Sequence, residues 1–566
     1  MAPLTVAIFS RGAGNQQYGL GLDAKLLELT FRELASLGKA QFTLTHKDPY
    51  TFMGDEVSDV HIYLEVPCRA AFSWAKVNVV MPNPEWWLKT EWNWVSKEPS
   101  SFFFYRSKWA RGLFSLPGAL IGWRCPTGSV ASARKSQVLY VVGGSINKIA
   151  ALNTVVSAWK PEYPPLIVVA SVGGAAKENV QWITGYVTKE ALKKLQEESQ
   201  YHCVASVAEG FGYTMAEAIS SGAQPLWTAL PVFTENWSGL LGEVGRIDVV
   251  AGDGNQMLEG PCTFTEEAVC RGVESMLANP IDSGRLRMAA ITMTKKFRGD
   301  FAAAWTGVEK LVKKAAPLYT PVPTLSAELP AIGVITLVHN RPEWFYHAVR
   351  NIETSTYPRD KLHWIIVDDG ERRVDSEIEK VRKGLPDLNI EYVSLAHKTT
   401  IGEKRNKGCD AALRLWHHIQ VFAFMDDDDH YPPESLTKRV TWLLASGKGA
   451  VACSTLPMYD LRHYISAMNV PPLDLDPCQR VSEATLCFSR QFWLQETFPK
   501  VNVAEGEQFL RDRDWLEISP RDIIVSFIHG KNSTSRRVPE SQEPNGCHYG
   551  FTDEYFTMIH QIASRA

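Results

Sequence analysis

Short runs of Val, Ile and Leu recur along the chain and alternate with longer segments of helical pattern. They lie at 5–9, 60–66, 76–82, 137–144, 165–171 and 180–186, and again at 333–339, 362–369, 389–395 and 421–426. Apolar runs without polar alternation are typical of strands buried on both faces, and such strands occur in parallel sheets covered by helices. The sequence therefore predicts an α/β protein.

A proline-rich segment divides this pattern into two parts. Residues 313–333 contain four prolines and few large apolar side chains, a composition typical of linkers between domains. The chain has 566 residues, which is too long for one hydrophobic core. We predict an N-terminal part at 1–315 with lobes at about 1–130 and 131–315, a linker at 316–331, and a C-terminal part at 332–566.

Charge and apolar content exclude several classes of protein. The formal net charge of -4 at pH 7 gives no extended basic field for nucleic acid, so no nucleic-acid partner is expected. No apolar run approaches the ~18 residues of a membrane-spanning helix, and the N-terminus reads as a strand and turn rather than a signal peptide. Ten cysteines without a CxxC pair indicate a reducing compartment. We expect a cytoplasmic protein, with attachment to a membrane surface as the alternative.

The stretch EGFGYTMAE, residues 209–217, is the sharpest motif of the N-terminal part. It follows a strand-like run and opens a helix. Gly210 and Gly212 let the backbone approach a ligand, and the first amides of the helix would face an anion such as a diphosphate. Glu209 and Glu217 offer carboxylates that accept hydrogen bonds from sugar hydroxyls. Helix capping is the simpler role for Glu209, but the glycines and the spacing favour a ligand site.

This motif, together with VVGGSINK at 141–148 and NVQWITGY at 179–186, resembles family 4 glycosyltransferases of the GT-B fold. The resemblance covers most of residues 1–310 and implies two Rossmann-like lobes, retention of anomeric configuration and no metal requirement. It implies that Glu209 meets the donor sugar as a catalytic residue and that Glu217 meets the nucleotide ribose. Further donor-binding residues that it implies are Lys148 at the diphosphate, Gly210, Phe211 and Gly212 in the motif, and Gly12 and Gly14 in a turn of the other lobe.

The stretch FAFMDDDDHYPP, residues 422–433, places four carboxylates behind an apolar run. A strand that ends here would present them at the edge of the sheet where ligands bind in open α/β folds. Two carboxylates one residue apart can reach one hard divalent cation, which also cancels their repulsion. A solvated acidic loop or an opportunistic calcium site is the simpler interpretation, and the buried strand in front argues against it.

Five motifs of the C-terminal part, VITLVHNRPEW, IIVDDG, IGEKRN, MDDDDHYPP and AEGEQFL, occur in this order. Together they resemble family 2 glycosyltransferases of the GT-A fold over about residues 330–535. The resemblance implies that Asp368 or Asp369 holds the nucleobase and that the loop with Lys404, Arg405 and Asn406 borders the nucleotide.

The same resemblance assigns the remaining candidate residues of the C-terminal part. Thr336, Asn340 and Arg341 of the first motif and Asp427 of the aspartate run are expected to bind the donor. Mn²⁺ or Mg²⁺ is expected on Asp426 and Asp428, with His529 completing the metal site. An inverting transfer needs a base for the acceptor hydroxyl, and Glu507 is the first candidate for it and Glu505 the second.

We therefore expect a bifunctional glycosyltransferase that uses UDP- or GDP-sugars. Its N-terminal module would retain configuration without metal, and its C-terminal module would invert configuration with Mn²⁺ or Mg²⁺. The acceptor would be a glycan, free as an oligosaccharide or linked to a lipid or a protein. In the alternative, only the C-terminal module is catalytic, and the N-terminal module is a carbohydrate-binding or assembly domain.

Overall fold

The computed structural model describes residues 3–12, 19–38, 41–54, 56–85, 87–126, 134–254, 260–315, 329–530, 532 and 543–565. The chain forms two compact units. Unit 1 comprises Met1–His46, Asp59–Pro67 and Val77–Ala315, and unit 2 comprises Lys47–Ser58, Cys68–Lys76 and Ala316–Ala566. Gly14 and residues 316–328 of the predicted linker lie outside the described residues.

The first lobe of unit 1 is built on a six-stranded sheet of order β2-β1-β3-β4-β5-β6. Its pairs β1–β3, β4–β5 and β5–β6 are parallel. The strands are β1 (Leu4–Phe9), β2 (Phe42–Lys47), β3 (Ser58–Leu64), β4 (Ala75–Met81), β5 (Ser101–Tyr105) and β6 (Gly118–Leu120). The helices of this lobe are α1 (Gly19–Ser36), α2 (Lys89–Val95) and α3 (Lys108–Phe114), while the 3-10 helix η1 (Arg69–Trp74) between β3 and β4 belongs to unit 2.

The second lobe has a six-stranded parallel sheet of order β12-β11-β10-β7-β8-β9. Its strands are β7 (Lys135–Gly143), β8 (Leu166–Ala170), β9 (Val180–Thr184), β10 (Ser199–Val204), β11 (Gln224–Thr228) and β12 (Arg246–Ile247). The helices are α4 (Ile146–Ala158), α5 (Lys189–Glu198), α6 (Tyr213–Ser221), α7 (Pro231–Leu241), α8 (Glu266–Ala278) and α9 (Ser283–Lys314). The chain adds strands β8 and β9 on one side of β7 and strands β10, β11 and β12 on the other. The point between β7 and β10 is therefore a topological switch point, where doubly wound sheets have their ligand crevice.

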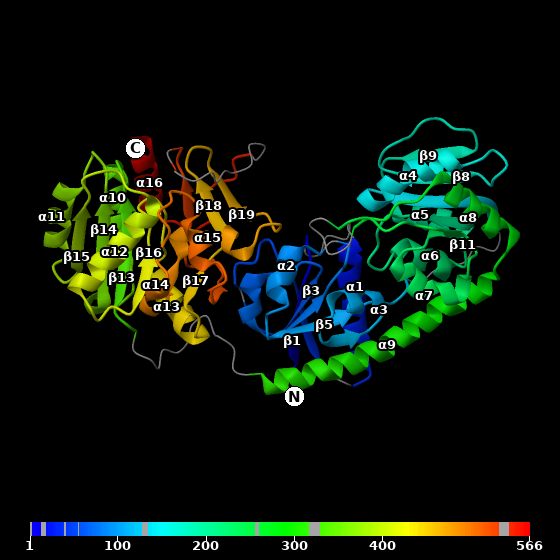
Figure 1. Ribbon diagram of the computed structural model, residues 1–566, viewed down its shortest axis with the longest axis horizontal. Coiled ribbons are helices and arrows are strands. Elements are labelled where there is room, and N and C mark those ends of the chain that lie inside the picture. Colours follow the sequence, from blue (N-terminus) through cyan, green and yellow to red (C-terminus); the bar gives the residue numbers. More distant parts are fainter. Residues whose placement is uncertain are drawn as a thin grey trace. The chain divides into compact units, whose positions relative to one another are not determined.

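Helix α9 joins the two lobes of unit 1 into one core. Figure 1 shows it as one long helix, drawn in green, along this unit. Asp282 caps its first turn, and the ring of Phe301 packs 5.5 Å from Phe31 and 5.7 Å from Phe104 of the first lobe, centroid to centroid. The same hydrophobic cluster includes side chains of α6. The interlobe arrangement therefore rests on apolar burial along α9.

Unit 2 is built on a seven-stranded mixed sheet of order β15-β14-β13-β16-β20-β17-β21. Its strands are β13 (Ile332–Val338), β14 (Leu362–Asp368), β15 (Asn389–Ser394), β16 (Val421–Phe424), β17 (Ala450–Ala452), β20 (Cys487–Ser489) and β21 (Trp515–Glu517). The first four strands are parallel, and β20 runs antiparallel to β16 and β17. The order of the strands changes direction between the parallel neighbours β13 and β16. In sheets of this kind, ligands bind beyond the carboxyl ends of the strands at such a switch point, and we call this side of the sheet its ligand edge.

Helices cover both faces of the parallel strands of unit 2. Phe345 of α10 stacks on Trp364 of β14, while Ala411 and Ala412 of α12 pack with Ile365 from the other face of that strand. The helices are α10 (Pro342–Thr354), α11 (Asp375–Gly384), α12 (Ile401–Leu415), α13 (Ser435–Ser446), α14 (Arg490–Gln495), α15 (Glu505–Leu510) and α16 (Asp553–Arg565). Short 3-10 helices are η2 (Arg359–Lys361), η3 (Pro477–Arg480) and η4 (Glu483–Thr485).

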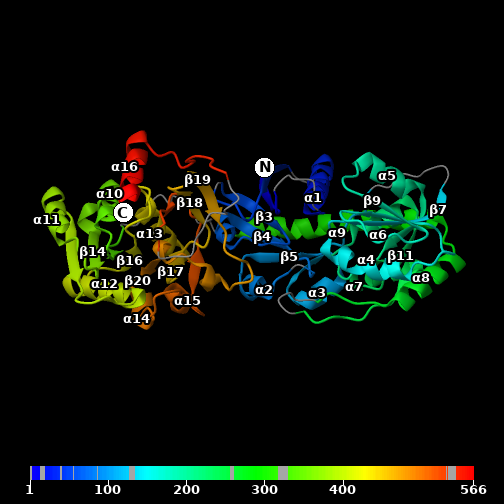
Figure 2. The same cartoon turned by 90° about the horizontal axis from the view of Figure 1, so that it is seen from above.

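A small second sheet and the last helix complete unit 2. The sheet has order β19-β18-β22, with β18 (Leu456–Asp460), β19 (Ile465–Asn469) and β22 (Ser526–Ile528). Helix α16, drawn in red, lies beside α10 in both views (Figures 1 and 2). The α/β architecture with several parallel sheets confirms the predicted fold class, and strands occur at every run that the sequence predicted. Strands such as β2, β5 and β11 were not predicted.

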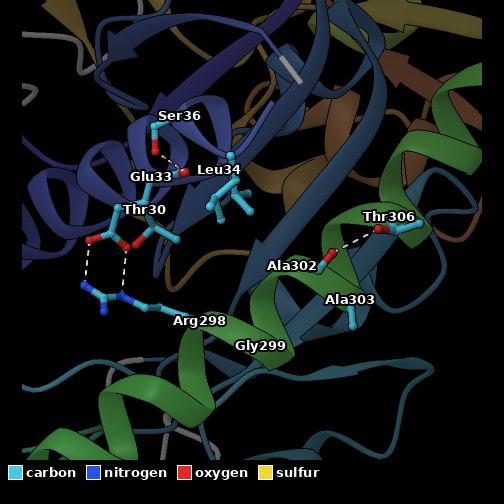
Figure 3. Close-up of a pocket in the computed structure, with 10 residues that line it drawn as sticks. Thr30, Glu33, Leu34, Ser36, Arg298, Gly299, Ala302, Ala303 and Thr306 are labelled. Atoms are coloured by element: carbon cyan, nitrogen blue, oxygen red, sulfur yellow. Dashed lines mark hydrogen bonds and ion pairs between the residues drawn. The ribbon is translucent and has the colours of Figure 1, made fainter. Parts of the chain in front are cut away.

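A groove of about 670 Å³ lies between α1 and α9 of unit 1. Figure 3 shows the Arg298 guanidinium facing the Glu33 carboxylate at this groove, where the two form ion-pair contacts of 2.8 and 2.9 Å. Its lining residues are Thr30, Glu33, Leu34, Ser36, Leu37, Arg298, Gly299, Ala302, Ala303 and Thr306. The residues predicted to bind a donor in unit 1 are not among them.

Phe301→Ala tests the role of α9. It removes a fully buried ring and should lower the free energy of unfolding by about 3–5 kcal/mol, because the cavity lies in the core shared by both lobes. Thr306→Ala, an exposed change on the same helix, is the control and should leave stability near that of the parent. Thermal unfolding followed by intrinsic fluorescence measures both. Equal melting temperatures for the two variants would contradict this role.

Candidate functional site

The GFG loop of unit 1 lies at the switch point of the second sheet, between the neighbouring strands β7 and β10. It follows β10, while α4 with Lys148 follows the neighbouring strand β7. The carboxyl ends of these two parallel strands meet at the same edge, so Glu209 and Lys148 come together. Lys148 Nζ lies 3.6 Å from Glu209 Oε1, and the two side chains are 14% and 13% exposed.

Glu217 lies in the same cluster, in the second turn of α6. Gln196 Nε2 donates to Glu217 Oε2 at 2.7 Å. Burial raises the pKa of Glu217, and the positive charge of Lys148 and the bond from Gln196 act against this rise. The structure therefore brings together Glu209, Glu217 and Lys148, which the sequence had assigned to one donor site.

Glycine is required at the two positions of the loop for different structural reasons. Gly212 precedes α6 with a φ of +80°, a left-handed conformation that favours glycine. Gly210 is close to the first lobe: a Cβ there would lie 1.6 Å from Asn83 Oδ1. Phe211 is buried and packs edge-on against Tyr213. Gly12 lies in the turn after β1 with a φ of +66°.

The first lobe reaches this loop through Glu85, a residue that the sequence analysis missed. Glu85 follows β4 and accepts hydrogen bonds from the Gly210 N–H at 2.9 Å and from Asn147 Nδ2 at 2.7 Å. Asn83 Nδ2 donates to Glu85 at 3.1 Å and to Glu65 at 2.6 Å. Three carboxylates, Glu65, Glu85 and Glu209, thus gather near one lysine. Their position after strands β3, β4 and β10 was the only signal in the sequence.

Burial raises the pKa of two of these carboxyl groups to neutral pH or above it. It raises the pKa of Glu85 to about 8, with further increases from the charges of Glu209 and Glu65. It raises the pKa of Glu65 to about 7, against the hydrogen bond from Asn83. Protonation therefore relieves the repulsion among the carboxylates.

In unit 2 the corresponding edge of the sheet brings together the loops after β13, β14 and β16 and the start of α12. Asp369 follows β14 and lies at the centre of one group. It accepts from Lys404 Nζ at 2.7 Å, from His339 Nδ1 at 2.9 Å and from the Thr399 N–H at 2.8 Å. Burial alone would raise the pKa of Asp369, but these contacts hold it below its usual value. A fixed carboxylate thus lies at the predicted nucleotide site.

Four predicted donor-binding residues are hydrogen-bonded to the framework of this edge. Asp368 is fully buried and accepts from two backbone N–H groups of the following loop and from Tyr392. Asn340 accepts from two backbone N–H groups after β14, at 2.7 and 2.9 Å. Thr336 accepts from the Trp364 indole, and Asn406 exchanges hydrogen bonds with the backbone of 498. These side chains order the loops that surround the site.

The four aspartates after β16 have separate partners. Asp427 accepts from Arg341 at 2.5 Å, and the same guanidinium also contacts Asp428. Asp429 Oδ1 accepts from the hydroxyl of Ser526 at 2.8 Å and from the Phe527 N–H at 3.1 Å, which fastens the loop to β22. Asp426 is partly exposed, and its backbone N–H donates to a tyrosine hydroxyl at 2.8 Å.

His529 lies against the third aspartate, as the sequence predicted for a residue of the metal site. Its Nε2 is 3.0 Å from Asp428 Oδ2, and its ring packs on Trp344. Nδ1 of His529 is buried and has no hydrogen-bond partner among the described residues. The Asp428 carboxylate thus contacts both the Arg341 guanidinium and the His529 imidazole.

These partners set the protonation of the aspartates. Burial raises the pKa of Asp426. It raises the pKa of Asp427 to about 7, although Arg341 opposes the rise. Burial acts on Asp428 in the same direction, but Arg341 and His529 hold the pKa of Asp428 well below its usual range. Of Asp426, Asp427 and Asp428, the last is therefore the most firmly ionised at neutral pH.

The two candidate bases have different surroundings. Glu505, the first residue of α15, is buried and accepts from Arg405 Nε at 2.9 Å. Arg405 also lies over the Phe424 ring, and both Asp426 and Glu505 raise its pKa against the effect of burial. Glu507 is directed to Arg511 and to Gln479 instead. The structure thus brings Glu505, and not Glu507, into the charge cluster of the aspartates.

Among the described residues no group of three or more His, Cys, Asp or Glu side chains is arranged to hold a metal ion. Asp428 and His529 are nevertheless in contact, and the Asp428 carboxylate is already paired with a cation, the Arg341 guanidinium. Carboxylate oxygen and imidazole nitrogen are donors that Mn²⁺ accepts. The chemistry of these residues therefore fits a divalent cation at Asp428, although the predicted ligands do not converge.

Residues 333–480 match the family model described as glycosyl transferase family 2. Within this range the chain is similar to glycosyltransferases of that family. The match covers the parallel strands, Arg341, the aspartate run and the nucleotide-side residues, so the resemblance to family 2 and its GT-A module is confirmed over this range. A comparison with curated proteins found none that matches.

Solved glycosyltransferases are similar to part of the chain. The mannosyltransferase PcManGT from Pyrobaculum calidifontis, in complex with GDP-Man and Mn²⁺, is 20% identical with a TM-score of 0.28, over 37% of this chain and 59% of that chain. Residues 1–349 of S. aureus TarS, in complex with UDP-GlcNAc, are 16% identical with a TM-score of 0.28, over 35% of this chain and 58% of that chain. This chain thus spans less than two thirds of each of these structures.

Within the described ranges, no helix of the chain is long and apolar enough to cross a membrane.

Glu85→Gln tests the interlobe carboxyl group. Because the pKa values of Glu85 and Glu65 are raised in the folded state, the stability from these groups is present at low pH. It is lost as pH rises toward 8, by at most about 1.4 kcal/mol per pH unit for each group. Glutamine cannot ionise, so this variant should show a smaller fall in melting temperature from pH 6 to pH 9 than the parent. Glu178→Gln, at an exposed position, should keep the parent's slope, and the same slope in all three proteins would contradict the account.

Proposed function

We propose that the C-terminal module transfers a sugar from a UDP- or GDP-sugar to a hydroxyl group of a glycan, with inversion and with Mn²⁺ or Mg²⁺. The arrangement around Asp428 carries this proposal. An ionised carboxylate, compensated by Arg341 and His529, lies at the ligand edge of the sheet, beside the fixed Asp369 and the start of α12. Neutralised carboxylates at such an edge are suited to a nucleoside diphosphate with a cation.

We assign roles in donor binding to the side chains at the ligand edge of the sheet of unit 2. Asp369, oriented by Lys404, accepts hydrogen bonds from the nucleobase, and Asp368 and Asn340 keep the surrounding loops in place. Arg405 has a second guanidinium nitrogen, Nη1, that is buried without a partner among the described residues. Such a donor can turn to a phosphate oxygen of the donor sugar.

Asp426, Asp428 and His529 would hold the divalent cation. When bound, the cation compensates the negative charge that develops on the departing diphosphate. Asp427 stays with Arg341, and this pair keeps the loop in position beside the metal site.

The transfer itself needs a base on the acceptor side. The acceptor hydroxyl gives its proton to a carboxylate, its oxygen forms the bond to the anomeric carbon, and the bond to the phosphate oxygen breaks with its electron pair. We assign the base to Glu505 rather than to Glu507, the first candidate from the sequence. Glu505 shares a charge cluster with Asp426, and it is free to accept a proton once Arg405 turns to phosphate.

For the N-terminal module we propose a second, retaining and metal-independent glycosyltransferase of the GT-B type. Two sheets of parallel strands in one unit, and a glycine loop at the switch point of the second sheet, support this proposal. Glu209 would meet the donor sugar, Glu217 the ribose and Lys148 the diphosphate, in a cluster whose members are already in contact. The predicted turn with Gly12 would face the same cleft.

One observation favours the alternative for this module. Glu85 already accepts from the Gly210 amide, where an anionic phosphate would bind, and the carboxyl groups of Glu65, Glu85 and Glu209 gather around the loop. Carboxyl groups in such number bind sugar hydroxyls more readily than they admit a diphosphate. A carbohydrate-binding or assembly domain is therefore the second candidate function of the N-terminal module.

Glu505→Gln and Glu507→Gln form a matched pair that tests the base. If Glu505 takes the proton, its amide variant should lose about 10²–10⁴-fold in kcat, and the acidic limb of the pH–rate profile should disappear. Glu507→Gln should keep kcat and the profile of the parent, because its carboxylate is directed to Arg511. Initial rates with the best nucleotide sugar measure both variants. The reverse pattern would return the role to Glu507.

Asp428→Asn and Glu209→Gln separate the two-enzyme proposal from the alternative. The full chain is assayed against a panel of UDP- and GDP-sugars, with Mn²⁺ and with a chelator. We expect two transfer activities: one that needs metal and falls by about 10²–10³-fold in Asp428→Asn, and one that is metal-independent and lost in Glu209→Gln. Asp410→Asn, exposed on α12, is the control. Loss of every activity in Asp428→Asn and of none in Glu209→Gln would leave the N-terminal module as a binding domain.

A further inference from the structure

Helix α16 carries a tyrosine whose hydroxyl lies between two histidines. Tyr555 Oη is 2.7 Å from His347 Nε2 on α10 and 2.7 Å from His430 Nδ1 in the aspartate loop. His347 Nδ1 is in turn 3.2 Å from the backbone carbonyl oxygen of Asp427. Tyr555 and His347 are both buried. One continuous chain of hydrogen bonds thus connects α16 with two points of the loop.

The chemistry of the groups gives this chain a direction. A carbonyl oxygen can only accept, so His347 Nδ1 carries the hydrogen that is donated to Asp427. In a neutral imidazole Nε2 is then an acceptor, and it takes the hydroxyl hydrogen of Tyr555. The tyrosine oxygen is left to accept from His430 Nδ1. With a neutral His347, both histidines thus carry a hydrogen on Nδ1, and bonds in such a chain strengthen one another.

The two anchored points lie on either side of Asp428. His347 holds the carbonyl of Asp427, one residue before it, and Tyr555 holds the ring of His430, two residues after it. Asn351 of α10 adds a further bond on this side, to the carbonyl of Asp429 at 2.9 Å. The backbone around Asp428 is consequently fixed from two helices, whereas its carboxylate remains directed at Arg341 and His529.

We propose that Tyr555 is a positioning residue for the glycosyltransferase reaction, because its hydroxyl sets the place of the Asp428 carboxylate through His347 and His430. This rests on the proposed role of Asp428 in metal and donor binding. The family match ends at residue 480, so α16 adds to the matched domain a contact that supports its metal loop. The helix thereby belongs to the catalytic unit.

Tyr555→Phe removes only the hydroxyl and tests the proposal in the full chain. It leaves two histidine nitrogens without a partner, so the loop loosens. We expect kcat to fall roughly 10- to 100-fold with a smaller change in donor KM. We also expect weaker binding of Mn²⁺, measured without substrate from the electron paramagnetic resonance signal of the free ion.

Tyr549→Phe is the matched control. Its hydroxyl lies in the same cluster of unit 2 but donates to the carbonyls of Met458 and Ala467. It should lower the melting temperature without changing kcat or Mn²⁺ affinity. If Tyr555→Phe also lowers only the melting temperature, the hydroxyl has a purely structural role and the proposal is wrong.

A second readout does not depend on metal or donor. Nitrogen NMR of the chain labelled with ¹⁵N only at histidine should show His347 and His430 with hydrogen on Nδ1, and Tyr555→Phe should shift both. Hydrogen on Nε2 of His347 would contradict the chain of bonds. Full turnover in Asp428→Asn would instead contradict the proposed function of Asp428 and leave this NMR result unchanged, so the two failures are distinguishable.

Discussion

Repulsion among four adjacent carboxylates is the constraint on which unit 2 depends. Asp427 is compensated by Arg341, Asp428 by Arg341 and His529, and Asp429 by donors of β22. Asp427, Asp428 and Asp429 are buried, so water supplies little of this compensation. Elements far apart in the chain are therefore held to one loop, and the Asp428 carboxylate is held between Arg341 and His529.

Repulsion among neighbouring carboxylates is reduced in different ways in the two units. In unit 2 guanidinium and imidazole groups lie beside the carboxylates, and the pKa of Asp428 is lowered. In unit 1 Lys148 pairs with Glu209, and the pKa values of Glu65 and Glu85 are raised by burial. A site with ionised, compensated carboxylates suits a cation and a diphosphate, whereas one with protonated carboxyl groups suits hydroxyls. This contrast supports a metal-dependent transfer in unit 2 and keeps two functions open for unit 1.

Local sequence patterns predicted the elements of the fold but not the long-range pairings of the site. Apolar runs located strands such as β7 and β13, and the position of Asp428 after β16 followed from its motif. The roles of Asp429 and Asn406 depend on partners about 90 residues away, which no periodicity reveals. Glu85 and Tyr555 belong to no motif, since their contacts arise only when loops and helices pack. The proposal of Glu505 rather than Glu507 as the base likewise depends on the contact of Glu505 with Arg405, which no sequence pattern reveals.

The most direct test is to locate the cation in crystals of the full chain grown with Mn²⁺ and a nucleoside diphosphate, by anomalous diffraction at the manganese edge. The account predicts one peak within coordination distance of Asp428, with Asp427 still bound to Arg341 and Asp429 still bound to β22. A peak on Asp427 or Asp429, or nucleoside diphosphate bound at this edge without manganese beside Asp428, would contradict it.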